Sequence, residues 1–426
     1  MDKFDAVIVG SGPAGMGAAF SILKRKKDAS ILMLDKRPYS TGGMRNDCKM
    51  NFTFPIGFPL EYWDEETADR YLEEVTDFLK PNILSKSNIG TYQARAERLG
   101  CSLLEIKQTH LGTDGGLELI KELLAKLKES GVELSLGEEM VGIDNKRKVI
   151  TTDKREIGYK SILIAPGRQG FHFLQDVMHQ LDINYMDNII DVGIRVETRL
   201  EHYPIVKDYY DPKFYFKEKV RTFCTNSGNA HVVKEKYATE RGDIWYSVNG
   251  HAFKADESKN NGLVNFALLK TVRFTEPLAS GQTFAEHLGL LASLMGGGKP
   301  LMQRVGDFRL GRRSKVATFN GDLYDFKPTL DACPSDISLA MPSKILRYIW
   351  SAMKNLDTIV PGVLHPSTIM YYPEIKLYAN KPEYKDEHFQ VCEGVFFAGD
   401  GAGTSRGITG AWASGIRASL GMLEYF

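Results

Sequence analysis

The stretch Asp5-Ala6-Val7-Ile8-Val9-Gly10-Ser11-Gly12-Pro13-Ala14-Gly15 decides the fold of this chain. Its apolar run, Ala6 to Val9, predicts a buried parallel strand, and a helix is expected from about Pro13 to Lys27. A second strand, Ser30 to Leu34, then leads to Asp35, twenty positions beyond Gly15. The order of strand, G-x-G-x-x-G turn, helix, strand and acidic residue predicts a Rossmann-type unit that binds a dinucleotide.

Each glycine of this turn has a physical role. Gly10 permits the tight turn, Gly12 lets the backbone approach a pyrophosphate, and Gly15 allows close packing of helix on strand. The helix N-terminus then faces the anion, and Asp35 can accept hydrogen bonds from ribose hydroxyls. The residues expected to contact the dinucleotide here are Gly10, Gly12, Pro13, Ala14, Gly15, Asp35 and Lys36.

Two later segments bear on which dinucleotide is bound. Residues 132–167 read as a strand, a small meander and a return strand that ends in Ala165-Pro166-Gly167. Near the C-terminus, residues 393–403 carry a strand that delivers Gly399-Asp400, followed by a helix. This segment resembles the second FAD motif of the two-dinucleotide-fold flavoproteins. The resemblance implies that the Asp400 carboxylate accepts a ribityl hydroxyl, and that Gly407 and Ile408 place a helix N-terminus at the flavin N1 and O2 atoms.

These segments resemble the FAD motifs of the two-dinucleotide-fold flavoproteins. The resemblance implies that Val141 lends backbone groups to adenine, with the turn at Ala165 and Gly167 beside it. Gly43 and Met44 fall in the loop expected to run along the ribityl chain. The three motifs occur in the correct order along the chain, so they predict non-covalent FAD rather than a nicotinamide nucleotide.

The chain as a whole resembles a prokaryotic family of uncharacterised FAD-dependent dehydrogenases, within the group that includes p-hydroxybenzoate hydroxylase and geranylgeranyl reductase. Beyond the FAD motifs, the resemblance rests on residues 191–197, 221–224 and 248–250. Relatives tend to read Cys-x-Cys-Pro-Gly-Gly where this chain has residues 223–229 without Pro-Gly-Gly. The resemblance therefore implies the reaction type and not the substrate.

The predicted fold class is α/β, with a Rossmann-type FAD-binding domain built from both chain ends and an inserted α+β substrate domain. We expect residues 1–170 and 391–426 to form the FAD-binding domain and residues 171–390 to form the inserted substrate or cap domain. No 20 to 50 residue repeat occurs, which excludes solenoids and propellers.

Composition narrows the class of partner and site. Lys+Arg and Asp+Glu both number 54, so no net charge favours nucleic acid. Five scattered cysteines without C-x-x-C, and nine histidines without metal-ligand spacing, predict neither a disulfide framework nor a metal site. The opening strand leaves no room for a signal peptide, and no apolar run is long enough for a membrane helix, so a cytoplasmic protein is expected.

The candidate catalytic residues are Cys224, Asn249 and His251, in the region expected to meet the flavin. Cys224 fits a proton donor or redox thiol, and an inert core thiol is the alternative. His251 fits proton exchange near neutral pH, and a structural histidine is the alternative. Aromatic residues between Tyr203 and Tyr246 fit core packing, with a stacked, flat or apolar substrate as the sharper hypothesis.

These residues predict an FAD-dependent oxidoreductase that transfers a hydride between FAD and a small molecule. NAD(P)H as a transient electron donor and an electron-carrier protein both remain open as partners. The rival interpretations are a flavin monooxygenase, and a flavoprotein that binds FAD without catalysis or is associated with RNA or a partner subunit, because one fold supports several functions.

Overall fold

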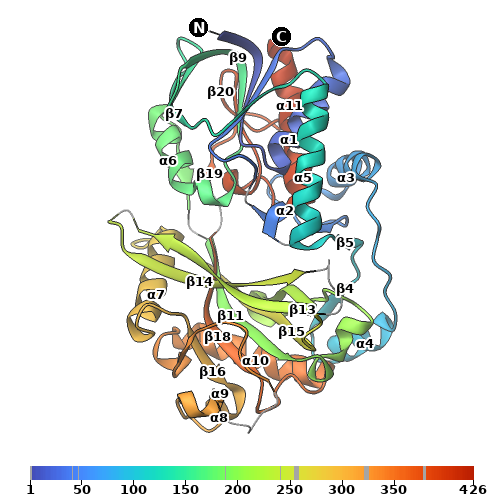
Figure 1. Ribbon diagram of the computed structural model, residues 1–426, viewed down its shortest axis with the longest axis vertical. Coiled ribbons are helices and arrows are strands. Elements are labelled where there is room, and N and C mark those ends of the chain that lie inside the picture. The colour runs from blue at the N-terminus through green and yellow to red at the C-terminus, as the bar shows by residue number, and fades with distance from the viewer. Residues whose placement is uncertain are drawn as a thin grey trace. The chain divides into compact units, whose positions relative to one another are not determined.

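The computed structural model describes residues 2–40, 42–46, 48–187, 189–239, 241–253, 259–320, 326–377 and 380–426. The chain divides into two compact units. Unit 1 consists of Met1–Ile83, Ile106–Asp187 and Tyr378–Phe426, and unit 2 consists of Leu84–Glu105 and Asn188–Leu377. Each unit has its own main sheet (Figure 1).

Unit 1 is a doubly wound α/β fold. Its main sheet has eight strands in the described residues, in the order β20-β21-β9-β1-β2-β6, with β8 paired to β9 and β7 paired to β8. Strand β1 pairs in parallel with both β2 and β9. The helices are α1 (Pro13–Arg25), α2 (Gly43–Asn46), α3 (Glu65–Leu79), α5 (Gly112–Glu129), α6 (Phe171–Gln180) and α11 (Ile408–Met422). The strands are β1 (Asp2–Val9), β2 (Ile31–Asp35), β3 (Lys49–Asn51), β5 (Gln108–His110), β6 (Glu133–Leu136), β7 (Met140–Asp144), β8 (Val149–Thr152), β9 (Glu156–Ile164), β10 (Tyr185–Met186), β19 (Lys381–Pro382), β20 (Gln390–Cys392) and β21 (Val395–Phe397).

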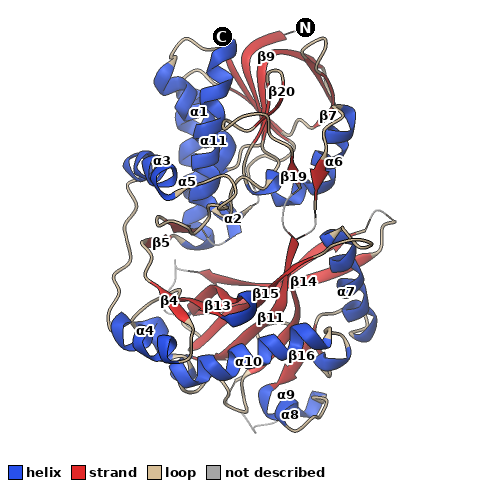
Figure 2. Cartoon of the chain, turned by 180° about the vertical axis from the view of Figure 1, so that it is seen from behind, coloured by secondary structure: helices blue, strands red, loops and turns tan. Residues whose placement is uncertain are grey.

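Helices cover both faces of this sheet. Ala6 and Ile8 of β1 face a core shared with α1, α3, α5 and α11, whereas Val7 and Val9 face a second core shared with α6. Figures 1 and 2 show α1, α5 and α11 together on one side of the sheet and α6 on the other. Because both faces are buried, β1 reads as an apolar run instead of an alternating strand.

Helices α1 and α11 pack closely through small residues. A Cβ atom at Gly415 would overlap the carbonyl oxygen of Ala14, and one at Gly17 would overlap the carbonyl oxygen of Trp412. The Ser21 and Ser419 hydroxyls are hydrogen-bonded at 2.5 Å in the same interface. The two helix axes can therefore approach only because side chains are nearly absent at these positions.

Unit 2 is built on a nine-stranded, mainly antiparallel sheet in the described residues, with the order β17-β16-β18-β11-β15-β13-β12-β4 and β14 paired with β13. Its strands are β4 (Ser102–Leu104), β11 (Ile189–Arg199), β12 (Lys213–Phe216), β13 (Val220–Ala238), β14 (Ile244–Phe253), β15 (Leu263–Arg273), β16 (Leu301–Arg304), β17 (Cys333–Pro334) and β18 (Ile369–Leu377). Its helices are α4 (Ile89–Arg98), α7 (Gly281–Met295), α8 (Val305–Arg309), α9 (Val316–Asn320) and α10 (Ser343–Ile359).

Strand β11 carries charged residues into the interior of unit 2. Four apolar residues of this strand alternate with one glycine and three charged residues, and all eight are buried: Ile190, Val192, Ile194 and Val196, and Gly193, Asp191, Arg195 and Glu197. A strand with one solvated face would expose the charged set. Their burial means that each charge requires a partner inside the unit.

The boundaries of the units differ from the expected 170/171 and 390/391. Residues 171–187 lie in unit 1 because Leu174, Val177 and Met178 of α6 pack against the parallel sheet. Residues 84–105 lie in unit 2 because β4 pairs with β12 in an antiparallel ladder.

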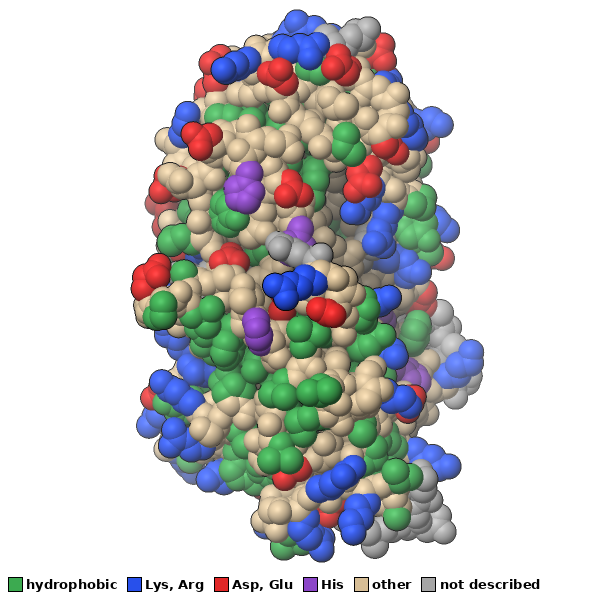
Figure 3. Space-filling model, turned by 90° about the vertical axis from the view of Figure 1, so that its left-hand side faces the viewer, with side chains coloured by type: hydrophobic (Ala, Val, Ile, Leu, Met, Phe, Trp, Pro, Cys, Tyr) green, Lys and Arg blue, Asp and Glu red, His purple; other side chains and the backbone are tan. Residues whose placement is uncertain are grey.

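Among the described helices, none has the length and apolar character needed to cross a membrane. On the face of the protein drawn in Figure 3, Lys and Arg side chains are interspersed with Asp and Glu. This mixture agrees with the equal totals of 54 basic and 54 acidic residues.

Candidate active site

The glycine turn of unit 1 joins β1 to α1. Gly10 has φ +107°, and a Cβ atom there would overlap the carbonyl oxygen of Ala165, so glycine is required on both grounds. Gly12 is the N-cap residue of α1 and provides no side-chain cap, while Pro13 is the first helical residue. The first turn of α1 therefore has backbone N–H groups that no side chain at the N-cap satisfies, which is the arrangement that binds an anion.

The other glycine-turn residues set the packing behind this helix end. A Cβ atom at Gly15 would overlap the carbonyl oxygen of Gly10, so Gly15 brings α1 against the turn, as predicted. Ala14 is buried, and its carbonyl oxygen faces Gly415 of α11. The glycine turn is thus held between α11 and the end of β9.

Asp35 ends β2 and binds the glycine turn. Its Oδ2 atom accepts hydrogen bonds from the Ser11 backbone N–H at 2.9 Å and the Ser11 hydroxyl at 2.7 Å, and its Oδ1 atom accepts from the Arg37 N–H at 3.0 Å. The expected ribose contact would use the remaining acceptor capacity of the carboxylate. Lys36 forms an exposed ion pair with Glu139 at 3.3 Å.

The strand that returns from the meander ends beside the same turn. The Ala165 N–H donates to the Val9 carbonyl oxygen at 2.8 Å, and Gly167 has φ +66°. Val141 lies on β7 with 55% of its surface exposed. The local structure around these residues agrees with the predicted strand, meander and return strand.

The second turn, at Gly399-Asp400, is locked by hydroxyl groups and by the start of α11. The Gly399 N–H donates to the Thr404 hydroxyl at 2.8 Å and to the Ser414 hydroxyl at 3.0 Å. Asp400 accepts from the Ser405 hydroxyl at 3.0 Å and from the Gly407 N–H at 2.9 Å. The sequence predicts that Asp400 and Gly407 belong to one site, and in the structure the two residues are joined by a hydrogen bond.

Helix α11 begins immediately after Gly407, which has φ +84° and provides no side-chain cap. Ile408, the first helical residue, is buried and lies near Gly43 of α2. Met44 is also fully buried, with its side chain in the core of unit 1, so only its backbone can serve a ligand. Helices α1 and α11 therefore both begin without side-chain caps, and the turn before α11 lies beside α1, where a Cβ atom at Gly399 would be 3.1 Å from the Ala14 side chain.

Burial raises the pKa of Asp400. Four neighbouring groups oppose that rise: the charges of Arg168 and Arg406, and the hydrogen bonds from the Gly407 N–H and the Ser405 hydroxyl. The Arg168 Nε atom lies 3.8 Å from Asp400 Oδ2. Arg168 was not among the predicted site residues. The sequence feature that could have identified Arg168 is its position directly after the turn at Gly167.

In unit 2, two of the three catalytic candidates meet at one guanidinium. Arg195 Nη1 donates to the Cys224 carbonyl oxygen at 3.0 Å, and Nη2 lies 3.5 Å from Asn249 Oδ1. Asn249 also donates through Nδ2 to Glu235 at 2.6 Å. Arg195 itself was not among the predicted site residues, because its meeting with these residues depends on strand pairing.

His251 lies two residues beyond Asn249 on β14, opposite His231 of β13. The His231 Nε2 atom is 2.7 Å from Asn229 Oδ1, and burial lowers the pKa of His231. A proton-exchanging role for His251 stays a prediction.

The aromatic residues divide between core and partial exposure. Tyr203, Tyr209, Phe214, Phe216 and Trp245 are buried, which supports the packing interpretation for these five. Tyr215, Phe223 and Tyr246 are half-buried. Arg221 lies 4.9 Å from the Phe223 ring, in the range of a cation–π contact.

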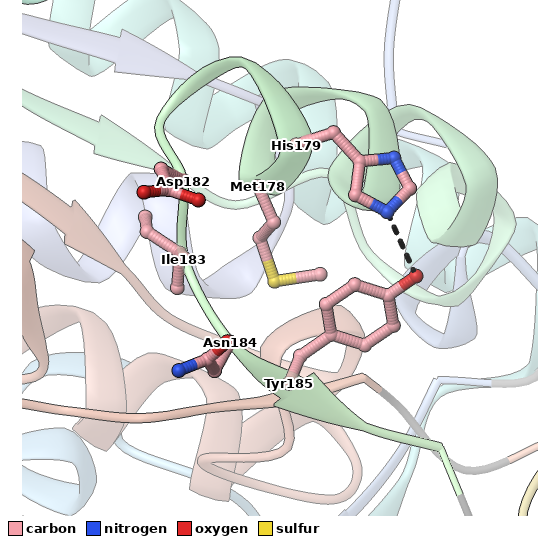
Figure 4. A pocket seen from close by; sticks show the side chains of 6 residues that line it. All are labelled: Met178, His179, Asp182, Ile183, Asn184 and Tyr185. Carbon is pink, nitrogen blue, oxygen red and sulfur yellow. Dashed lines mark hydrogen bonds between the residues drawn. The ribbon is translucent and has the colours of Figure 1, made fainter.

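A shallow hollow of about 310 Å³ occurs in unit 1 at the C-terminal end of α6 (Figure 4). It is lined by Met178, His179, Asp182, Ile183, Asn184 and Tyr185, and the Tyr185 hydroxyl is 3.3 Å from His179 Nε2. None of the predicted site residues lines it, and it is not part of the dinucleotide turn.

Comparison with known proteins agrees with this geometry. Residues 4–194 match the pyridine nucleotide-disulphide oxidoreductase family. An uncharacterized protein of Clostridium beijerinckii is 23% identical over 467 residues, covering 100% of this chain and 81% of that protein. An uncharacterized protein of Methanosarcina barkeri is 31% identical over 80 residues, covering 18% of this chain and 20% of that protein.

Solved structures align over nearly the whole chain. A geranylgeranyl bacteriochlorophyll reductase-like protein from Thermoplasma acidophilum is 13% identical with a TM-score of 0.42, covering 100% of this chain and 79% of that chain. The p-nitrophenol 4-monooxygenase of Pseudomonas putida is 12% identical with a TM-score of 0.39, covering 100% and 78%.

The family match in residues 4–194 and the parallel α/β sheet of unit 1 agree with each other. Both the fold class and the enzyme class predicted from the sequence are thereby confirmed. The chain is accordingly an oxidoreductase with a Rossmann-type fold, similar over residues 4–194 to the pyridine nucleotide-disulphide oxidoreductase family.

Proposed function

We propose that this protein is a dehydrogenase or reductase that transfers a hydride between non-covalently bound FAD and a small substrate that is flat or apolar. One observation carries the proposal: α1 and α11 begin at Gly10–Gly12 and Gly399–Gly407 without side-chain caps, and they pack against each other through Gly17 and Gly415. Two adjacent helix N-termini fit a ligand with an anionic pyrophosphate and a ring on which negative charge develops.

The residues of unit 1 divide the binding work. The first turn of α1 and Gly12 would hold the pyrophosphate, with Asp35 and the backbone at Val141 on the adenosine side. Asp400 would orient the ribityl chain, and the N-terminus of α11 at Gly407 would stabilise negative charge on the flavin. When bound, FAD supplies the hydride chemistry itself.

Unit 2 contains the candidate residues for the substrate chemistry. The candidates for holding or moving a proton are Cys224, Asn249 and His251. The half-buried aromatic residues Phe223 and Tyr215 are the candidates for contacting a flat substrate. The Arg195 guanidinium is already paired with Glu374 and Asn265, so the half-buried aromatic surface favours a weakly polar substrate over a charged one.

The test is an anaerobic titration of the purified protein with NADH and then NADPH, following the flavin absorbance at about 450 nm. Bleaching identifies a nicotinamide-dependent enzyme, and admission of air then separates a reductase from a monooxygenase by the appearance of hydroxylated product. If dithionite bleaches the flavin and nicotinamides do not, the donor is a substrate or an electron-carrier protein. A protein without flavin, even after reconstitution, would contradict the proposal.

A further inference from the structure

Strand β13 is interrupted at Cys224. Its pairing with β15 shifts in register between Phe223 and Asn226, and Cys224 has φ +47°, in the left-handed region. A residue with a Cβ atom adopts this conformation at a cost in free energy, so surrounding contacts have to hold it there. The bulge therefore turns one half-buried thiol out of the regular alternation of the strand.

Two side chains hold the carbonyl oxygen of this bulged residue. Arg195 Nη1 donates to it at 3.0 Å, and Asn226 Nδ2 donates to it at 3.3 Å. The Asn226 Nδ2 atom also lies 3.9 Å from the Cys224 Sγ atom. On the far side of the bulge, the Thr225 N–H donates to buried Asp211 at 2.8 Å.

Arg195 is fixed in turn by a second set of contacts. Its Nε and Nη2 atoms donate to the two carboxylate oxygens of Glu374, both at 2.7 Å, and Nη1 donates to Asn265 Oδ1 at 2.8 Å. Arg195, Glu374 and Asn265 are each 0% exposed. A bidentate guanidinium–carboxylate pair fixes direction as well as distance, which a lysine cannot do.

Two further features show how closely the interior is fitted around this pair. A Cβ atom at Gly250 of β14 would overlap Arg195 Nη1, Asn226 Nδ2 and Asn265 Oδ1. The Asn265 Nδ2 atom is buried and has no hydrogen-bond partner among the described residues. A buried donor without an acceptor is costly, so this amide points to an acceptor atom brought by a bound molecule.

We propose that Arg195 and Asn226 are positioning residues that fix both the orientation and the acidity of the Cys224 thiol, the candidate acid of the reaction. This inference rests on the proposed function for its role in catalysis. The structural part of the inference concerns unit 2 alone: two side chains that hold the backbone of Cys224 control its thiol. Arg195 acts through the carbonyl group, and Asn226 acts through both the carbonyl group and the sulfur.

The test measures alkylation of individual cysteines by iodoacetamide as a function of pH, with peptide mass spectrometry to assign each site. In Asn226→Ala and in Arg195→Lys, we expect the alkylation of Cys224 at neutral pH to fall about fivefold and its pH midpoint to rise, because donors that stabilise the thiolate are lost or misplaced. Half-buried Cys333 and Cys392 serve as internal references in the same sample.

Asn145→Ala is the matched control. Asn145 Nδ2 lies 3.4 Å from the Cys392 sulfur, so this change should alter Cys392 and leave Cys224 unchanged. Equal changes at Cys224, Cys333 and Cys392 in the Arg195 variant would reveal general loosening and overturn the proposal. So would a Cys224 rate within twofold of the wild-type rate in both Asn226→Ala and Arg195→Lys.

Alkylation requires no flavin, so this result is independent of the proposed function. A wild-type protein that never binds or reduces FAD would contradict the proposed function while leaving the thiol measurement intact. In a wild-type protein that does reduce FAD, Arg195→Lys should shift the pH profile of flavin reduction in the same direction as it shifts Cys224 alkylation. If Arg195→Lys fails to fold, Asn226→Ala still decides the question.

Discussion

The backbone N–H of Gly407 donates a hydrogen bond to the Oδ2 atom of Asp400 at 2.9 Å. This bond ties the turn after β21 to the first residue before α11, so the carboxylate and the helix N-terminus occupy fixed positions before any ligand binds. Preorganised groups lose less entropy on binding, which makes the pair a sensitive place to test the cofactor assignment.

Asp400→Ala should weaken FAD retention about tenfold, because it removes the expected ribityl acceptor and releases Gly407. The ratio of flavin absorbance to protein after gel filtration, followed by fluorescence titration of the stripped protein with FAD, measures this effect. Asp144→Ala, which alters an exposed turn carboxylate, should retain wild-type occupancy. Equal FAD affinity in the two variants would remove Asp400 from the site.

Arg168→Ala should make FAD retention more sensitive to acid. Burial raises the pKa of Asp400, and the Arg168 charge lowers it. Removing Arg168 raises this pKa further, so on acidification the carboxylate is protonated, and FAD is released, at a higher pH than in the wild-type protein. FAD occupancy measured by ultrafiltration across a pH series reports the midpoint. Arg147→Ala, in an exposed pair with Glu156, is the control, and a shared midpoint in the two variants would count against the pairing.

Gly415→Ala should destabilise the protein by about 1–3 kcal/mol, because the added methyl group overlaps the Ala14 carbonyl oxygen and separates α1 from α11. Urea denaturation measures the free energy of unfolding. The same variant should bind FAD more weakly, since both helix N-termini move. Gly90→Ala in α4, where an added Cβ atom meets nothing within 4 Å, should be close to neutral. Equal stability of the two variants would contradict the packing argument.

Arg195→Met should cost about 3–5 kcal/mol, because it leaves the Glu374 carboxylate buried without its main partner. The double change Arg195→Met with Glu374→Leu should be more stable than the single change, since the unpaired carboxylate is then absent and Lys376 keeps Glu235 as a partner. Chemical denaturation of all three proteins checks the order. A double variant less stable than Arg195→Met would mean that the packing of Glu374 outweighs its charge.

The protein should lose stability as pH falls below about 6.5, the ordinary histidine pKa. The His202 ring stacks on His365 with centroids 4.0 Å apart, and burial, followed by the nearby His365, lowers the pKa of His202. The folded state therefore binds this proton less readily than the unfolded state, so protonation favours unfolding. His202→Gln should reduce the loss between pH 7.5 and pH 5.5, as measured by urea denaturation. An unchanged pH dependence would assign the loss to other groups.

The parts of the site that sequence predicts are those defined by local spacing. The turn at Gly10 to Gly15, Asp35, and the pair Gly399-Asp400 follow strands directly, and the ends of parallel strands meet at one edge of a sheet. The order of these motifs along the chain is therefore enough to predict that these residues lie close together.

The parts that sequence does not predict depend on pairing between distant strands. Arg195 and Glu374 meet because β11 pairs with β18, and Cys224 joins them only through a register shift in β13. No periodicity records a bulge or the register of a ladder. The placement of residues 84–105 in unit 2 has the same origin, since β4 is short and is identified by its partner β12.

Unit 1 is assembled from three separate stretches of chain, so α1 can pack against α11 only after the last stretch has been synthesised. While the chain is being synthesised, α1 and β1 emerge early, yet the helix that packs into Gly17 emerges after the whole of unit 2. The glycine turn therefore lacks the helix that packs beside it until α11 has also been synthesised. Contacts so distant along the chain slow folding. A chain that ends before α11 would therefore have an incomplete site, with apolar surface of α1 exposed.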